Sequence, residues 1–319
     1  MPIGGGGSAE YEDGLPLFEY TLASLVGVPA AYFNSALSPY GTINGYDLDV
    51  HFSGSSVYYG FQGGVSYKIN DLVSMSLGGR YVIAKNSYEG YMENIKLHTS
   101  SGGDLTSAIL GSALADVEVD AERSGSGMCG ILGVNLSPND NLNIGIRYET
   151  ITKLEMENET ATGKDGGSEE FTDGAKFNAD IPSQLAVGLS YKMSKLKLMS
   201  DFNYFGNTGV DWDGDEANFD NSLEFGLGAE YKLTEKLLVS AGYLKSTSGA
   251  KSVGQSDLDF NLDSWTVGAG LRYSLTPSIA INIGALNTFY TEAKKTTRTI
   301  TEKYNQTTFG CAFGLQASL

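Results

Sequence analysis

Only four residues of this 319-residue chain are histidine or cysteine: His51, His98, Cys129 and Cys311. A nucleophilic hydrolase needs a reactive side chain beside a histidine, and a zinc site needs three or four histidine, cysteine or carboxylate ligands. Cys129 and Cys311 also fall on opposite faces in the strand pattern given below, which argues against a disulfide. We therefore expect no enzyme, no metal site and no resident cofactor.

Carboxylates concentrate in Asp211-Trp212-Asp213-Gly214-Asp215-Glu216. A calcium loop of the EF-hand type has glycine at its sixth place and glutamate at its twelfth, whereas here glycine is fourth and Ser222 is twelfth. A calcium site and a solvated acidic loop both remain open, and the spacing favours the acidic loop.

A third pattern could bind an apolar ligand. Within residues 104–117, apolar side chains recur at the spacing of a helix, namely Leu105, Ile109, Leu110, Leu114 and Val117. Asp104 can cap the start of this helix. Its apolar stripe has two possible roles: it captures a hydrophobic ligand, or it packs against its own loop.

Composition limits the fold that can position these groups. The 41 glycines disfavour a helical bundle, and 21 basic against 38 acidic residues give a net charge of −17, which disfavours nucleic acid as a partner. No apolar run is long enough for a membrane-spanning helix. Hydropathy averages do not detect membrane strands, however, because such strands alternate apolar and polar residues.

Alternation with a period of two is the dominant pattern of the chain. From Val57 to Ile69, apolar residues alternate with small or polar ones, and similar segments follow to the C-terminus. Eleven strands are predicted near residues 57–69, 72–87, 126–136, 141–156, 180–193, 196–208, 220–233, 236–247, 262–275, 278–293 and 304–319. Most exceed the roughly 5 to 6 residues of a soluble strand and reach the roughly 9 to 11 that cross a bilayer. The sequence thus predicts an all-β, transmembrane, antiparallel up-and-down barrel.

The connections between these strands alternate in length. Two-to-four-residue turns, such as Asn70-Asp71 and Thr234-Glu235, alternate with long polar segments, which is typical of bacterial outer-membrane barrels with short inner turns and long outer loops. Four tyrosines precede short turns on the apolar face and are predicted to form one aromatic girdle: Tyr67, Tyr191, Tyr231 and Tyr273.

Several stretches resemble the FadL-like transporters of long-chain fatty acids and hydrocarbons in bacterial outer membranes. They are Gly63 to Glu89, Phe177 to Trp212, Trp265 to Phe289, and the glycine-rich opening Gly4 to Pro16. The resemblance implies a fourteen-stranded barrel with an N-terminal hatch, of which about eleven strands are present. We therefore expect the chain to lack its signal, its hatch and three strands. We also expect residues 1–45 to be a glycine-rich segment and outer loop, and residues 46–319 to be the barrel, with one short loop helix near 104–117.

The resemblance implies passive transport of long-chain fatty acids or other hydrophobic small molecules in the outer membrane. The inward face supports this interpretation, because apolar residues such as Tyr58, Phe205 and Leu286 stand among many glycines and serines, whereas a general porin needs a charged lumen. The expected ligand contacts are these three residues and the stripe in 104–117. A general porin and a surface or adhesion-type barrel remain alternatives. Expected partners are the ligand, outer-membrane lipid and lipopolysaccharide, and the barrel assembly machinery, with the chain as a monomer.

Overall fold

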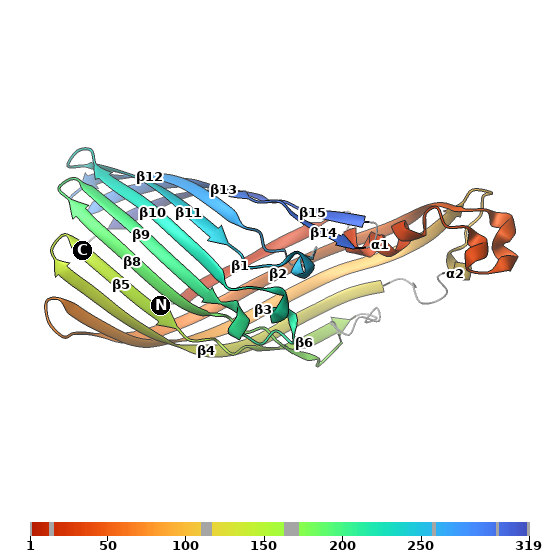
Figure 1. Cartoon of the computed structure of the whole chain (residues 1–319), viewed down its shortest axis with the longest axis horizontal. Helices are drawn as coiled ribbons and strands as arrows, with labels where there is room; N and C mark the ends of the chain where they lie inside the picture. Colours follow the sequence, from red (N-terminus) through yellow and green to blue (C-terminus); the bar gives the residue numbers. More distant parts are fainter. Residues whose placement is uncertain are drawn as a thin grey trace.

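Antiparallel strands form most of the protein (Figure 1). The structure is a computed structural model that describes residues 2–12, 16–109, 117–162, 172–256, 260–297 and 300–317. Within this part, one curved sheet has the strand order β1-β2-β3-β4-β5-β8-β9-β10-β11-β12-β13-β16, which follows the order of these strands in the chain. The edges of this order are β1 and β16.

The strands of this order and their bounds are β1 Pro2–Tyr11, β2 Ile43–Lys68, β3 Val73–Thr99, β4 Val117–Asn139, β5 Leu142–Glu149, β8 Ser183–Met193, β9 Leu196–Gly206, β10 Ser222–Lys232, β11 Leu237–Thr247, β12 Ser264–Thr276, β13 Ile279–Tyr290 and β16 Thr307–Ala317. Beside it, β6 Glu155–Thr162 pairs with β4 and with β7 Lys176–Asn178, and β14 Ala293–Thr297 pairs with β15 Ile300–Tyr304.

Helical segments are short: α1 Pro16–Leu25, α2 Thr106–Ile109, η1 Ala30–Tyr32, η2 Ser35–Tyr40, η5 Asn207–Gly209, η6 Asp215–Asn218 and η7 Ser252–Gly254. In the described ranges, none of them has the length and apolar character that a helical membrane span requires.

The predicted alternation places large apolar side chains on the outside of the sheet. Leu227 on β10 is 50% exposed and Val267 on β12 is 42% exposed, and both stand beside Tyr243 of β11. The four girdle tyrosines are all exposed, and each lies at the end of its strand next to a short turn. The predicted outer face and girdle are therefore confirmed.

Side chains at the short turns close them by accepting backbone hydrogen bonds. Asn70 Oδ1 accepts from Leu72 N and Val73 N, and Thr234 Oγ1 accepts from Lys236 N and Leu237 N. Such local acceptors favour a turn over a continued strand. This explains why hairpins end sharply at this edge of the sheet.

The glycine-rich opening differs from the expected connecting segment, because residues 2–11 form β1. This strand pairs along its length with β2, from Pro2 opposite Phe61 to Tyr11 opposite Phe52. A Cβ atom at Gly6 would lie 2.3 Å from the carbonyl oxygen of Ser56, so glycine permits the close approach of the two backbones. The expected outer loop therefore does not begin at residue 1, because these glycines take part in strand pairing.

The predicted strand over 141–156 is divided in two. β5 ends at Glu149, which pairs with Ile131 of β4, and β6 then pairs with the outer part of β4 from Glu155 opposite Ser126. The residues between them bend the chain, with Thr150 Oγ1 accepting from Gly130 N. The bend brings the segment after β5 to the inward face of the sheet.

β2 and β3 extend far beyond the strands from β5 onward, and β4, with 23 residues, follows β3 as far as Met92 (Figure 1). β2 has 26 residues and β10 has 11, so the difference corresponds to on the order of 50 Å of strand. We call the outer part of this hairpin, with α1 and α2, the outer extension. Its own core consists of Leu22, Ile43 and Leu97, which are buried together.

Candidate functional site

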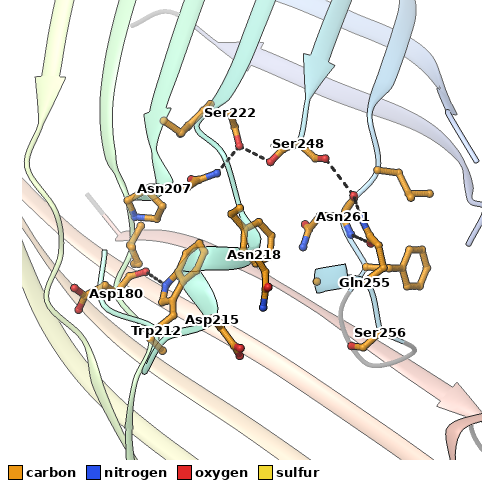
Figure 2. A pocket seen from close by; sticks show the side chains of 18 of the residues that line it. Asp180, Asn207, Trp212, Asp215, Asn218, Ser222, Ser248, Gln255, Ser256 and Asn261 are labelled. Carbon is orange, nitrogen blue, oxygen red and sulfur yellow. Dashed lines mark hydrogen bonds between the residues drawn. The ribbon is translucent and has the colours of Figure 1, made fainter. Parts of the chain in front are cut away.

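A large cavity of about 1560 Å³ lies where the strands meet the long connections, at the end of the sheet opposite the short turns. Figure 2 shows its polar wall, formed by residues of several loops. Aromatic residues from different elements also line it: Tyr58, Phe177, Phe205, Trp212, Phe219, Phe260 and Tyr290.

Asp180 connects three of the segments that build this cavity. Its carboxylate, almost completely buried, accepts from Leu154 N at 3.0 Å and from Asp211 N at 3.2 Å, and Lys153 Nζ lies 2.6 Å away. Trp212 Nε1 donates to the Asp180 carbonyl oxygen at 2.8 Å (Figure 2). The hydrogen bond to Asp180 raises the pKa of Lys153 above its ordinary value. These contacts hold the segment after β5 against the loop that follows β9.

The acidic loop 211–216 is ordered by its own carboxylates. Glu216 Oε2 accepts from Trp212 N at 3.1 Å and from Gly214 N at 3.0 Å. Its own backbone N–H and those two N–H groups hold the pKa of Glu216 below its ordinary value. Gly214 has φ of +103°, a conformation that favours glycine. The loop thereby fixes Trp212, whose ring meets that of Phe219 edge to face at 5.1 Å.

Neutral polar groups form the opposite wall (Figure 2). Asn207 Nδ2 donates to Ser222 Oγ at 2.6 Å, and Ser222 Oγ donates to the Ser248 carbonyl oxygen at 2.6 Å. Further along, Gln255 and Asn261 exchange two hydrogen bonds, from Gln255 Nε2 to Asn261 O and from Asn261 N to Gln255 Oε1. These hydrogen bonds satisfy the polar groups of the loops and fix the loops to one another.

Arg123 contributes a cation to the cavity wall and is held between two aromatic rings. Its guanidinium carbon lies 4.9 Å from the ring centroid of Tyr88 and 4.7 Å from that of Phe177, and Arg123 Nε donates to Asn158 Oδ1 at 2.8 Å. Stacking and hydrogen bonding together fix the orientation of Phe177 toward the lumen. Next to it, Tyr58 packs against a buried cluster of Ala84, Leu154 and Met156.

A second space of about 510 Å³ lies nearer the short turns. Half of its fourteen lining residues are glycine, serine or alanine, and Gln62 and Arg147 also line it. Arg80 and Arg147 both pair with the buried carboxylate of Glu149, and Arg80 also donates to Gln62 Oε1 at 2.9 Å. Opposite charges on the inward face therefore neutralise one another.

Two of the residues predicted to bind ligand come together in the large cavity. Tyr58 reaches it from β2 and Phe205 from β9. Leu286 stands on the inward face of β13, opposite Gly268, but does not line this cavity. The contact of these residues with a ligand stays a prediction.

The predicted stripe in 104–117 is only partly described. Leu105 is 2% exposed, and Ile109 packs against the core of the outer extension, so neither side chain presents an open apolar surface. Val117 is the first residue of β4, so the predicted helix does not reach it. Leu110 and Leu114 lie outside the described residues. For Leu105 and Ile109, the structure favours the packing role.

Sequence reasoning missed two aromatic residues of the cavity wall, Trp212 in the loop after β9 and Phe177 on the short strand β7. A signal was available, because each stands in a largely polar segment, where solvent exposure of a large aromatic side chain would be costly.

Other side chains that could bind a metal ion or react as nucleophiles are few in the described part of the chain. No group of three or more histidine, cysteine or carboxylate side chains there could hold a metal ion. Cys129 is buried and Cys311 is exposed, and both are free thiols. His98 Nε2 lies 2.8 Å from Asp47 Oδ2 on the outer extension, away from the cavity.

Comparisons with known proteins give a consistent result. Residues 30–319 match the family described as "Outer membrane protein transport protein (OMPP1/FadL/TodX)". A FadL homologue of Pseudomonas aeruginosa superposes with a TM-score of 0.58 at 14% identity, over 85% of this chain and 76% of that one. The P. putida toluene transporter TodX superposes with a TM-score of 0.56 at 13% identity, over 99% of this chain and 78% of that one. A comparison with curated protein sequences gives no match.

The family match covers most of the chain, and the similar structures share its fold. The predicted barrel class and the predicted resemblance are both confirmed. The chain therefore belongs to the OMPP1/FadL/TodX family of outer membrane transport proteins, and it is a β-barrel transport protein rather than an enzyme.

Proposed function

We propose that this protein admits hydrophobic small molecules across the outer membrane through the large cavity. The observation that carries the proposal is the lining, where aromatic rings from separate elements surround a space of about 1560 Å³. Aromatic side chains bury large apolar areas, and a drug-sized ligand needs a pocket of about 300 to 1,000 Å³. The proposed ligand contacts are Tyr58 and Phe205 in the cavity and Leu286 further along the inward face.

Transport is passive in this proposal. The driving force is transfer of apolar surface from water, about 0.8 kcal/mol per buried methylene. Long-chain fatty acids fit this mechanism through their acyl chains.

An uncharged aromatic hydrocarbon is a second candidate ligand, supported by the charges of the lining. The described lining residues include four carboxylates and three basic side chains. Two of the basic side chains are engaged, since Lys176 pairs with Glu155 and Lys295 donates to the Gln255 carbonyl oxygen. A carboxylate head group would therefore meet net repulsion, which an uncharged ring would not. The toluene transporter TodX, which has a similar fold, is named for such a ligand.

Fluorescence of Trp212 can test the proposal, since this residue lines the cavity. In the Trp265→Phe background, Trp212 is the only tryptophan. The full chain in lipid nanodiscs would be titrated with oleate and with toluene. We expect saturable quenching, and Phe205→Ala should weaken binding by about tenfold or more, because a buried aromatic ring is lost.

The matched control is Phe202→Ala, on the same strand but on the outer face. It should leave the titration unchanged. Equal effects of the two substitutions, or no saturable quenching with either ligand, would contradict the proposed site. Uptake of sucrose by vesicles at the same rate with and without Phe205→Ala would favour a general porin, whereas absence of both binding and uptake would favour a surface barrel.

A further inference from the structure

The longest uncharged stretch of the sequence lies at the far end of the outer extension. No aspartate, glutamate, lysine, arginine or histidine occurs from Tyr20 to Tyr46, although the chain carries a net charge of −17. These residues form α1, η1, η2 and the start of β2, at the end of the molecule away from the short turns (Figure 1). We call residues 26–42 the tip loop.

Large apolar side chains on the tip loop face outward. Tyr32 is 81% exposed, and Val26, Phe33 and Tyr40 are each between 38% and 44% exposed. Tyr32 and Phe33 form an edge-to-face pair with ring centroids 5.5 Å apart. The barrel strands expose similar side chains because lipid surrounds them, but the tip loop precedes the start of β2, which is on the order of 50 Å of strand longer than β10.

Backbone groups of the tip loop form hydrogen bonds within the protein. Gly27 N donates to Ile43 O at 2.8 Å, and Ala30 N donates to Gly41 O at 2.8 Å. Asn34 Oδ1 accepts from Ala36 N at 2.9 Å at the start of η2. An apolar phase excludes backbone groups that lack partners, so this internal satisfaction is what insertion into lipid requires.

The neighbouring turn after β3 continues the uncharged surface. Ser100 Oγ accepts from Thr42 N at 3.0 Å, and Ser101 N donates to Tyr40 O. Residues 99–103 of this turn carry no charge. Of the charged groups that flank these residues, Asp47 and His98 pair with each other, and Asp104 accepts from Thr106 N at 2.8 Å.

We infer that the tip loop is a docking surface for an external lipid surface without net charge, into which Tyr32, Phe33 and Tyr40 insert. Tyrosine and aromatic residues favour the boundary between lipid head groups and acyl chains. The acidic chain is repelled by anionic lipid, so a zwitterionic surface is the complementary partner. This inference rests on the tip loop alone and does not depend on the ligand proposed for the cavity.

The test uses the full chain in nanodiscs and separate vesicles of phosphatidylcholine, with flotation as the measurement. We expect the protein, and not empty nanodiscs, to float with the vesicles. The double variant Tyr32→Ser and Phe33→Ser should bind at least about tenfold more weakly, since two rings lose their apolar contact. The matched control is Tyr91→Ser, which removes a 44% exposed aromatic residue from β3 below the tip.

A second variant keeps the inference testable if the double variant fails to fold. Phe33→Trp retains an aromatic residue, and vesicles with brominated acyl chains should quench its added fluorescence. Unchanged binding of a folded double variant, absence of binding by the unaltered protein, or absence of quenching would overturn the inference. Tighter, salt-sensitive binding to phosphatidylglycerol vesicles would overturn it too, because attraction would then be electrostatic. Loss of Trp212 quenching by toluene with normal flotation would contradict only the proposed function.

Discussion

Arg80 Nη1 lies 2.9 Å from Glu149 Oε2, although β4 separates the strands that carry them. Arg80 stands opposite Cys129 and Glu149 opposite Ile131, two residues apart on β4, so the side chains meet diagonally across that strand. Arg147 pairs with the same carboxylate. One buried carboxylate thus pairs with two guanidinium groups on the inward wall, and Arg147 lines the smaller cavity.

Replacing Glu149 with glutamine should destabilise the barrel. Two arginines would then face each other without a counter-charge, and loss of one partner of a buried pair costs up to about 3 to 5 kcal/mol. We expect about 1 to 3 kcal/mol, because the Arg147 side chain is 45% exposed and solvent screens it. Unfolding in guanidinium chloride, with the protein in lipid, measures this change. The double variant Arg80→Gln and Glu149→Gln should recover part of the loss, and no recovery would argue against direct coupling.

Arginine on the outer face should impair assembly. Leu227 is central in β10 and Val267 stands at the same level on β12, since both pair with Tyr243. Leu227→Arg or Val267→Arg should cost about 2 to 4 kcal/mol if the site is at the bilayer midplane. Heat-modifiable mobility on gels measures the folded fraction.

The control for this series is Gly228→Arg, because Gly228 faces inward, where a Cβ atom would lie 3.4 Å from the Met199 side chain. Arginine there should retain more folded protein than at Leu227. Equal tolerance at all three positions would contradict the assignment of the outer face to lipid.

The loop around Trp212 should loosen in acid. The folded-state pKa of Glu216 is lowered, so its contribution to loop stability is present above the ordinary glutamate pKa and is lost as pH falls through the lowered value. In the Trp265→Phe background, emission from Trp212 should shift to longer wavelength over that acidic range and stay constant near neutral pH. The variant Glu216→Gln should show the shifted emission already at neutral pH. Emission independent of pH in both proteins would refute this role of Glu216.

Asp180→Asn should loosen the contact between the segment after β5 and the loop after β9. The amide has one acceptor oxygen, whereas the carboxylate accepts from both Leu154 N and Asp211 N. Loss of a charge-assisted hydrogen bond, about 1.5 to 3 kcal/mol, would raise amide exchange at one of these two sites by about tenfold to a hundredfold. Hydrogen exchange with mass spectrometry measures this.

Lys153→Gln is the matched control for Asp180, since the Lys153 side chain is 71% exposed and its ion pair with Asp180 is screened. This substitution should change amide hydrogen exchange at Leu154 and Asp211 only slightly. Because the pKa of Lys153 is raised, this ion pair is fully formed below the ordinary lysine pKa and is lost only as pH rises through the raised value. Exchange protection that depends on Lys153 near neutral pH would contradict the dominance of the backbone contacts.

The barrel could be predicted because the residues of each strand alternate according to the environment of its two faces. On β10, Leu223, Phe225 and Leu227 face lipid while Glu224 and Gly226 face inward, and a period of two is visible without knowledge of the partner strand. β1 could not be predicted in the same way, since its glycines have no side chains to alternate. Its placement depends on the complementary backbone of β2.

Half of the site was predictable for the same reason. Tyr58 and Phe205 lie on strands, so the alternation of side chains along each strand predicts which face of the sheet they occupy. Trp212 lies on a loop and Phe177 on the three-residue strand β7, and the position of such short segments depends on distant contacts such as that between Asp180 and the Trp212 indole. The helical spacing around Leu105 indicated apolar side chains that must be covered. Spacing alone does not show whether a ligand or another part of the protein covers them.

The outer extension and the cavity have separate apolar cores, one around Leu22 and Leu97 and the other around Leu154 and Met156. Substitutions in one core should have effects on stability that add independently to those in the other. The outer extension is thus a module that evolution or an engineer can vary. A different tip could be grafted onto β2 and β3, or the existing one removed, while the lumen keeps the size and selectivity set by its own residues.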